Sequence, residues 1–105
     1  MSTKKLLAER GATHGDFSDN AHISQELKAI VCTTDNWNFK FTDVQKEAME
    51  IILHKIARIS CGNPHFIDSW KDISGYAMLV VERLQKDPQG LDVKNEYFRP
   101  YGKDI

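Results

Sequence analysis

Residues 47–76 read EAMEIILHKIARISCGNPHFIDSWKDISGY, and this stretch decides the fold. Apolar residues recur every three or four positions on both sides of the Gly62-Asn63-Pro64 turn. This spacing predicts two amphipathic helices, and glycine and proline directly after a helical pattern are typical of a helix end. The stretch is therefore expected to form a helical hairpin.

The first helix of the hairpin is expected to run from Thr42 or Asp43 to about Ser60, and the second from Asp68 or Ser69 to the break at Asp87. At 100° per residue, two apolar sides are predicted: Ala48, Met49, Ile52, Leu53, Ile56 and Ile59 on the first helix, and Trp70, Ile73, Ala77, Val80, Val81 and Leu84 on the second. Gly75 is unfavourable inside a helix, which indicates that a neighbouring helix or a ligand approaches the backbone closely there.

Two further helices are expected before the hairpin. A short helix over residues 3–9 would end at Gly11, followed by a loop over residues 10–17 that contains Gly11 and Gly15. A longer helix is predicted from about Ser18 to Cys32, with apolar residues at Ala21, Ile23, Leu27, Ile30 and Val31. The Trp37 and Phe39 segment is expected to be a loop whose aromatic rings cap the core.

These elements predict one all-α domain over residues 1–105, a small bundle of three to four helices with a core over about residues 3–86. The remaining residues 87–105 are expected to form an irregular C-terminal arm that covers the core or a partner chain, because three aromatic residues in five are costly to leave in water.

Composition excludes several classes of partner. The formal net charge is −1, so no overall charge favours a nucleic acid polymer or an anionic membrane. No apolar run approaches the roughly 18 residues of a membrane span, and no signal-peptide pattern is present. Cys32 and Cys61 are expected to be reduced, buried thiols of a cytoplasmic protein.

Four carboxylates in the hairpin indicate a cation site. Glu47 and Glu50 share one helix face, and Asp68 and Asp72 lie one turn apart on the next helix. Hard oxygen ligands of this kind suit Mg²⁺ or Mn²⁺. Because Asp68 and Asp72 begin their helix, gathering all four acids requires strong helix tilting or a second chain.

The basic residues of the first hairpin helix allow two interpretations. Lys55 and Arg58 would bind phosphate oxygens beside such a metal. Alternatively, Lys55 pairs with Asp72 and Arg58 pairs with Asp68 within the hairpin, and the two glutamates are simply solvated. Spacing alone favours the ion-pair interpretation.

Three segments resemble a family of small bacteriophage and prophage proteins of unknown function that are described as MazG-like: HGDFSDN (14–20), QKEAMEIILHKIARISCGNP (45–64) and DSWKDISGYAMLV (68–80). The resemblance covers roughly residues 9–84. The pattern Glu47-x-x-Glu50 followed by Asp68-x-x-x-Asp72 is similar to the paired acidic motif of all-α nucleoside triphosphate pyrophosphohydrolases. The first acid of the second motif falls on Ser69, and Asp68, one place earlier, would take its role.

The resemblance implies a homodimer or higher homo-oligomer in the cytoplasm of a bacterial host, which would cleave a nucleoside triphosphate with Mg²⁺ or Mn²⁺. Asp72 and Asp68 would be catalytic, Glu47, Glu50, Asp68 and Asp72 would hold the metal, and Lys55 and Arg58 would bind phosphate. His14, Asp16 and Asn20 would contact the base or sugar, although local hydrogen bonds of a turn explain His14 and Asp16 equally well. Two alternatives remain: a protein that sequesters a nucleotide, for example one used in host defence signalling, without cleaving it, and a pure protein-interaction module.

Overall fold

The computed structural model describes residues 2–89, and all of its regular elements are helices. Four α-helices span α1 (Thr3–His14), α2 (Phe17–Val31), α3 (Asp43–Cys61) and α4 (Ile67–Lys86), and a short π-helical turn, η1, spans Asn36–Lys40. The predicted all-α bundle is confirmed. The expected C-terminal arm lies outside the described residues from position 90 onward.

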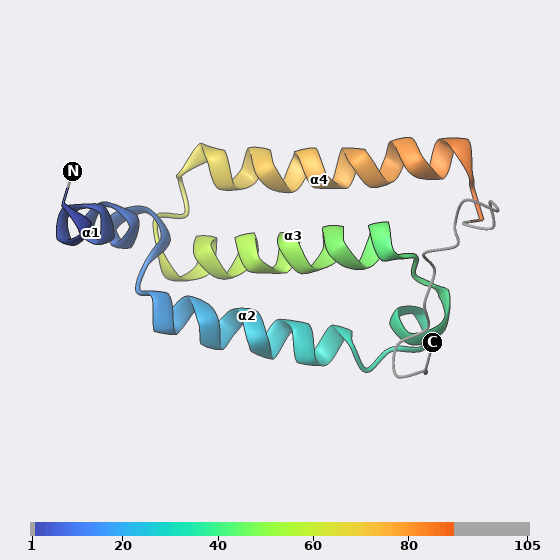
Figure 1. The fold of residues 1–105 in the computed structure, drawn as a ribbon, viewed down its shortest axis with the longest axis horizontal. Helices are drawn as coiled ribbons and strands as arrows, with labels where there is room; N and C mark the ends of the chain where they lie inside the picture. The colour runs from blue at the N-terminus through green and yellow to red at the C-terminus, as the bar shows by residue number, and fades with distance from the viewer. Residues whose placement is uncertain (1, 90–105) are drawn as a thin grey trace.

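The helices α2, α3 and α4 lie side by side in a single layer, with α3 in the middle (Figure 1). Successive helices run in opposite directions, and α1 projects from the end of the layer where α2 begins and α3 ends (Figure 1). The middle helix, α3, therefore contacts a long helix on each side. The two broad faces of the layer are not covered by another long helix of the described chain.

Helix ends follow local capping chemistry. Thr42 and Gln45 form a reciprocal capping box at the start of α3, with the Thr42 side chain accepting from the Gln45 N–H and the Gln45 side chain accepting from the Thr42 N–H. At the start of α2, the Asp16 carboxylate accepts a hydrogen bond from the Ser18 N–H. The predicted bounds of α2 and α3 agree with the structure to within one residue.

The predicted break at Gly11 is wrong. α1 begins at the Ser2 cap and continues through Gly11 to His14, so most of the expected loop is helical. A side chain at Gly11 would meet no atom within 4 Å, so nothing requires glycine to stop the helix there. The chain turns instead at Gly15, whose φ of 81° favours glycine.

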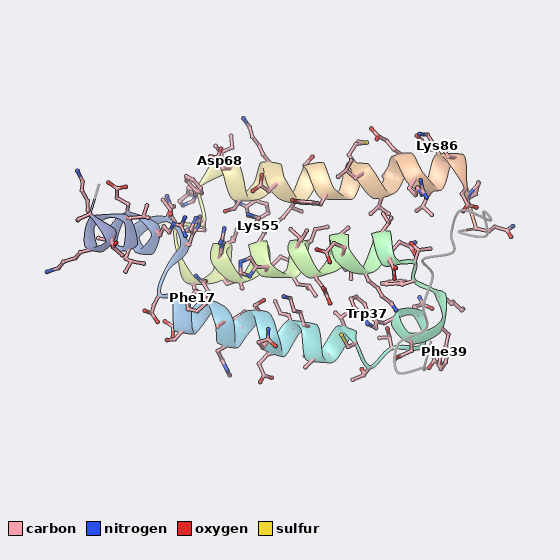
Figure 2. All side chains as sticks on the ribbon, viewed as in Figure 1. Phe17, Trp37, Phe39, Lys55, Asp68 and Lys86 are labelled. Carbon is pink, nitrogen blue, oxygen red and sulfur yellow. The ribbon has the colours of Figure 1, made fainter. Side chains whose placement is uncertain are left out.

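Trp37 is the largest fully buried side chain of residues 2–89, with 1% of its surface exposed. Its ring lies 5.7 Å from that of Phe41, and the Lys46 ammonium lies above it. The prediction that this segment caps the core is right for Trp37, but Phe39 is exposed and points away from the layer (Figure 2). The expected loop is a π-helical turn.

The buried sides of α2 and α4 differ from the predicted ones. On α2 the fully buried residues are Asn20 and Ser24, whereas Ile30 is exposed. On α4 the buried position is Ser69, whereas Trp70 and Val81 are exposed. Within residues 2–89, no helix is both long and apolar enough to cross a membrane.

Candidate functional site

Two glycines fix the corner where α1, α2 and α3 meet. A Cβ atom at Gly15 would collide with the carbonyl oxygen of Cys61, and one at Gly62 would collide with the main chain of Thr13 and His14. The Asn63 N–H also donates to the Thr13 carbonyl at 2.9 Å. The end of α1 is therefore held directly against the end of α3, which places side chains from three helices around one point.

These side chains surround a hollow of about 390 Å³, which we name the corner hollow. Such a volume falls within the range of small-molecule sites in proteins. Its lining residues are Leu7, Arg10, Gly11, His14, Gly15, Asp16, Phe17, Asn20, His54 and Arg58. Four residues predicted to contact a ligand, His14, Asp16, Asn20 and Arg58, thus lie around the same space. Arg10 and His54 were assigned no ligand role from the sequence.

Two polar atoms of residues that line the corner hollow lack a partner. Asn20 is 4% exposed, and its amide nitrogen donates to the main-chain carbonyl of His14 at 2.7 Å. Its Oδ1 atom is buried and accepts no hydrogen bond, and Nδ1 of His14 is also buried without a partner. A buried polar atom without a partner costs about 1–3 kcal/mol. A polar group of a ligand that reached these two atoms would supply the partners that residues 2–89 do not.

Positive charge surrounds His14. Burial lowers the pKa of its imidazole, and the nearby charges of Arg58, Lys55 and Arg10 lower it further. The pKa of His54 is likewise lowered, first by burial and then by Arg58, Lys28, Lys55 and His14. Both imidazoles are held towards the neutral form, first because they are partly buried and then because cationic groups lie nearby.

Arg58 has no ion-pair partner within residues 2–89. Arg58 is partly buried and lines the corner hollow. The predicted pair between Arg58 and Asp68 is not formed, because Asp68 is exposed at the start of α4. A planar cation without a carboxylate beside it remains able to bind an anion with two parallel hydrogen bonds.

Lys55 is already paired. Its Nζ atom lies 2.9 Å from Oδ2 of Asp72, and its side chain is 16% exposed. Figure 2 shows Lys55 in the space between α3 and α4, with Asp68 at the beginning of α4. The hairpin ion-pair interpretation is therefore right for Lys55 and Asp72. Lys55 does not line the corner hollow, although its charge acts on His14.

Asp16 has a structural role at the rim of the corner hollow. Its Oδ2 accepts hydrogen bonds from the Ser18 hydroxyl at 2.6 Å and from the Ser18 N–H at 3.1 Å. The hydroxyl bond is the main reason that the pKa of Asp16 lies below its ordinary value. Local hydrogen bonding, one of the two explanations for this residue, is thus present, and it leaves one carboxylate oxygen for a ligand.

The four acids predicted to hold a metal do not form a group in the described part of one chain. Residues 2–89 contain no cluster of three or more histidine, cysteine, aspartate or glutamate side chains that would hold a metal ion. Glu47 is exposed, and Glu50 faces α2, where its charge adds to burial in raising the pKa of Cys32. The magnesium site stays a prediction that needs a second chain or a different helix arrangement.

Cys32 and Cys61 are both free thiols. They are partly exposed and lie at opposite ends of the helical layer, at the ends of α2 and α3 (Figure 1).

Comparisons with protein-family models, with curated proteins and with solved structures find no significant match to this chain. The function is therefore argued from the geometry of the corner hollow.

Proposed function

We propose that this protein binds a small phosphate-bearing ligand, of which a nucleotide is the best-fitting class, in the corner hollow. The observation that carries the proposal is the combination of the unpaired Arg58 with the unpartnered Asn20 Oδ1 and His14 Nδ1 around one space. Arg58, with the exposed Arg10 at the rim, supplies charge for phosphate oxygens. Asn20 and His14 supply polar groups that recognise the polar edges of the bound ligand.

An aromatic ring supports a nucleotide over a free phosphate. Phe17 is the first residue of α2, lines the corner hollow and leaves 78% of its surface exposed. A large exposed ring beside cationic groups is the usual platform on which a nucleobase stacks. Phosphate at Arg58, a base on Phe17 and a polar contact to Asn20 together account for the lining of the hollow.

Binding without cleavage is the form of the proposal that the geometry supports best. Lys55 and Asp72 neutralise each other, and no cluster of acids for a metal is found among residues 2–89. The Mg²⁺-dependent pyrophosphohydrolase implied by the family resemblance is the alternative. That alternative is tied to a homo-oligomer, because acids from a second chain would have to complete the metal site.

One experiment separates these alternatives. The purified protein is titrated with ribonucleoside and deoxynucleoside mono- and triphosphates and with cyclic nucleotides, with and without Mg²⁺, by calorimetry. Each mixture is then denatured, and the recovered nucleotide and any released pyrophosphate are measured. Saturable binding that needs no metal and returns intact ligand supports a binding protein. Pyrophosphate release that needs Mg²⁺ supports the hydrolase, and no binding of any nucleotide contradicts the proposal.

A further inference from the structure

The single layer of helices has one polar face and one apolar face. Glu50 of α3 lines an open hollow together with Lys28 and Cys32 of α2, so these groups lie on one side of the layer. The Lys55–Asp72 pair lies between α3 and α4. At 100° per residue, Glu50, His54 and Arg58 point to this polar face, and Ile52 and Ile56 point away from it.

The opposite face of α3 and α4 is apolar. An open hollow of about 260 Å³ lies there, and its lining is apolar except for Gln45: Phe41, Gln45, Ala48, Met49, Ile52, Ala77 and Val80. On the α4 wheel, Trp70 and Val81 lie on the same side as Ala77, and Asp72 and Leu79 lie on the other. Trp70 and Val81 are 53% and 42% exposed.

α2 extends this apolar surface. Its buried positions Asn20 and Ser24 face α3, and Lys28 and Cys32 turn towards the polar face. Ile23 and Ile30 therefore point to the opposite side, and Ile30 is 66% exposed. We name the resulting surface, defined by Ile23, Ile30, Ile52, Ile56, Trp70 and Val81, the apolar face.

The described chain buries little apolar surface on its own. The buried hydrophobic residues of positions 2–89 are Trp37, Ala48, Leu53 and Ala57, and two of these are alanines. Helical domains are normally stabilised by two packed layers that bury one stripe of each helix. Within residues 2–89 this layer has no second layer packed against it, and the apolar face is where such a layer would pack.

We propose that the apolar face binds the same face of a second copy of this chain. α3 contains 19 residues and is therefore about 28 Å long. Three helices with axes about 9 Å apart span about 27 Å, so the face offers on the order of 700 Å². A standard stable interface buries about 800 Å² per partner. Each chain thus supplies the layer that the other lacks, and the contact closes as a two-fold dimer.

Other occupants fit this surface less well. A single amphipathic helix fills a groove one helix wide, whereas the apolar face extends across three helices. An anionic membrane is attracted by basic residues, but the α2 edge of the face carries Asp19 and Glu26. A second copy of the chain matches the width of the face.

The proposed contact is independent of the ligand. The corner hollow opens beside His54 and Arg58, on the polar side, so a dimer through the apolar face leaves both hollows accessible. The same contact keeps the acids of the two chains on opposite outer surfaces, because Glu50 and Asp72 point to the polar side. A dimer of this kind would not assemble the metal site that the resemblance implies.

The test is the mass of the full chain in solution, measured by light scattering and sedimentation over a range of concentrations. The wild type is expected to have the mass of two chains. Val81→Glu places a charge in the apolar face and is expected to give the mass of one chain at the same concentration. Leu79→Glu is the matched control on α4, since Leu79 is 55% exposed but points to the other side, and it should leave the dimer intact.

The milder variant Val81→Ser guards against loss of folding, with helix content checked by circular dichroism. It should stay helical and weaken association by at least about tenfold, because one methyl-rich side chain is lost from each copy. Quenching of tryptophan fluorescence by a soluble quencher should also rise when the wild type is diluted. Dissociation would expose Trp70, whereas Trp37 stays buried. A wild type with the mass of one chain at every concentration overturns the proposal. A dimer that Leu79→Glu disrupts and Val81→Glu does not also overturns it.

Discussion

Asn20 donates a hydrogen bond to the main-chain carbonyl of His14 at 2.7 Å, and each residue keeps one buried polar atom without a partner. This contact ties the start of α2 to the end of α1, and both residues line the same hollow. One interaction therefore serves both the fold and the candidate ligand site.

Replacing Asn20 should cost more stability than replacing a neighbouring buried serine. Asn20→Ala removes a buried hydrogen bond and should lower the free energy of unfolding by about 1–3 kcal/mol. Ser24, one turn later on the same side of α2, is 2% exposed and its hydroxyl has no partner. Ser24→Ala should therefore leave stability unchanged or raise it slightly. Urea denaturation of the two variants measures both effects, and equal losses of stability would contradict the account.

Stability should depend on pH through His14 and His54. The pKa of each lies below its ordinary 6.5, mainly because of burial. The folded chain therefore binds fewer protons than the unfolded chain just below pH 6.5, and stability falls as pH drops through this range. Full stability is present above pH 6.5, and the loss levels off once the folded-state pKa values are passed.

Denaturant unfolding at a series of pH values checks this dependence. The His14→Gln, His54→Gln double variant should show a shallower loss of stability below pH 6.5 than the wild type. His65 is exposed and serves as the control, so His65→Gln should keep the wild-type slope. An unchanged slope in the double variant would exclude these two imidazoles as the cause.

Two glycines are expected to respond to alanine in opposite ways. Gly75 was expected to allow close approach of a neighbour, but a Cβ atom there would meet nothing within 4 Å. Gly75→Ala should therefore raise the free energy of unfolding by about 0.5–1 kcal/mol, because alanine favours the helix. Gly15→Ala should destabilise the chain, because its Cβ would collide with Cys61 and its φ is positive. Melting temperatures that move in the same direction would contradict this contrast.

The Lys55–Asp72 pair should contribute little to stability. Asp72 is 49% exposed, so water screens the interaction despite the 2.9 Å separation. A double-mutant cycle with Lys55→Met and Asp72→Asn should give a coupling energy of about 0.2–1 kcal/mol that decreases with added salt. A much larger, salt-insensitive coupling would contradict an ion pair that water screens.

The helix bounds were the most predictable part of the fold. Thr42 with Gln45 and Gly62 with Pro64 act locally, so their effect on α3 can be seen in the sequence. Gly11 was misjudged because glycine only weakens a helix, and the turn was decided by packing of Gly15 against Cys61. The observed buried side of α4 differs from the predicted one by about one residue, because Ser69 rather than Trp70 is buried.

The candidate site was predictable only in part. His14, Asp16 and Asn20 are close in sequence, and Arg58 was expected to bind phosphate, so their common position could be anticipated. The positions of Arg10 and His54 beside this site could not be anticipated, since they depend on how α1 lies against α3. The acid cluster could not be judged either, because the contact between two helices is set by their lateral offset and not by spacing along each helix.

The most direct test of the central claim is the affinity of Arg58→Gln for the nucleotide that binds the wild type best, measured by calorimetry. Arg83 is exposed on α4 at the end of the layer away from the corner hollow, so Arg83→Gln is the matched control (Figure 1). Loss of a charge-assisted hydrogen bond to phosphate should weaken binding about ten- to hundredfold in Arg58→Gln, with no change in Arg83→Gln. Equal affinity of both variants and the wild type would contradict a ligand site in the corner hollow.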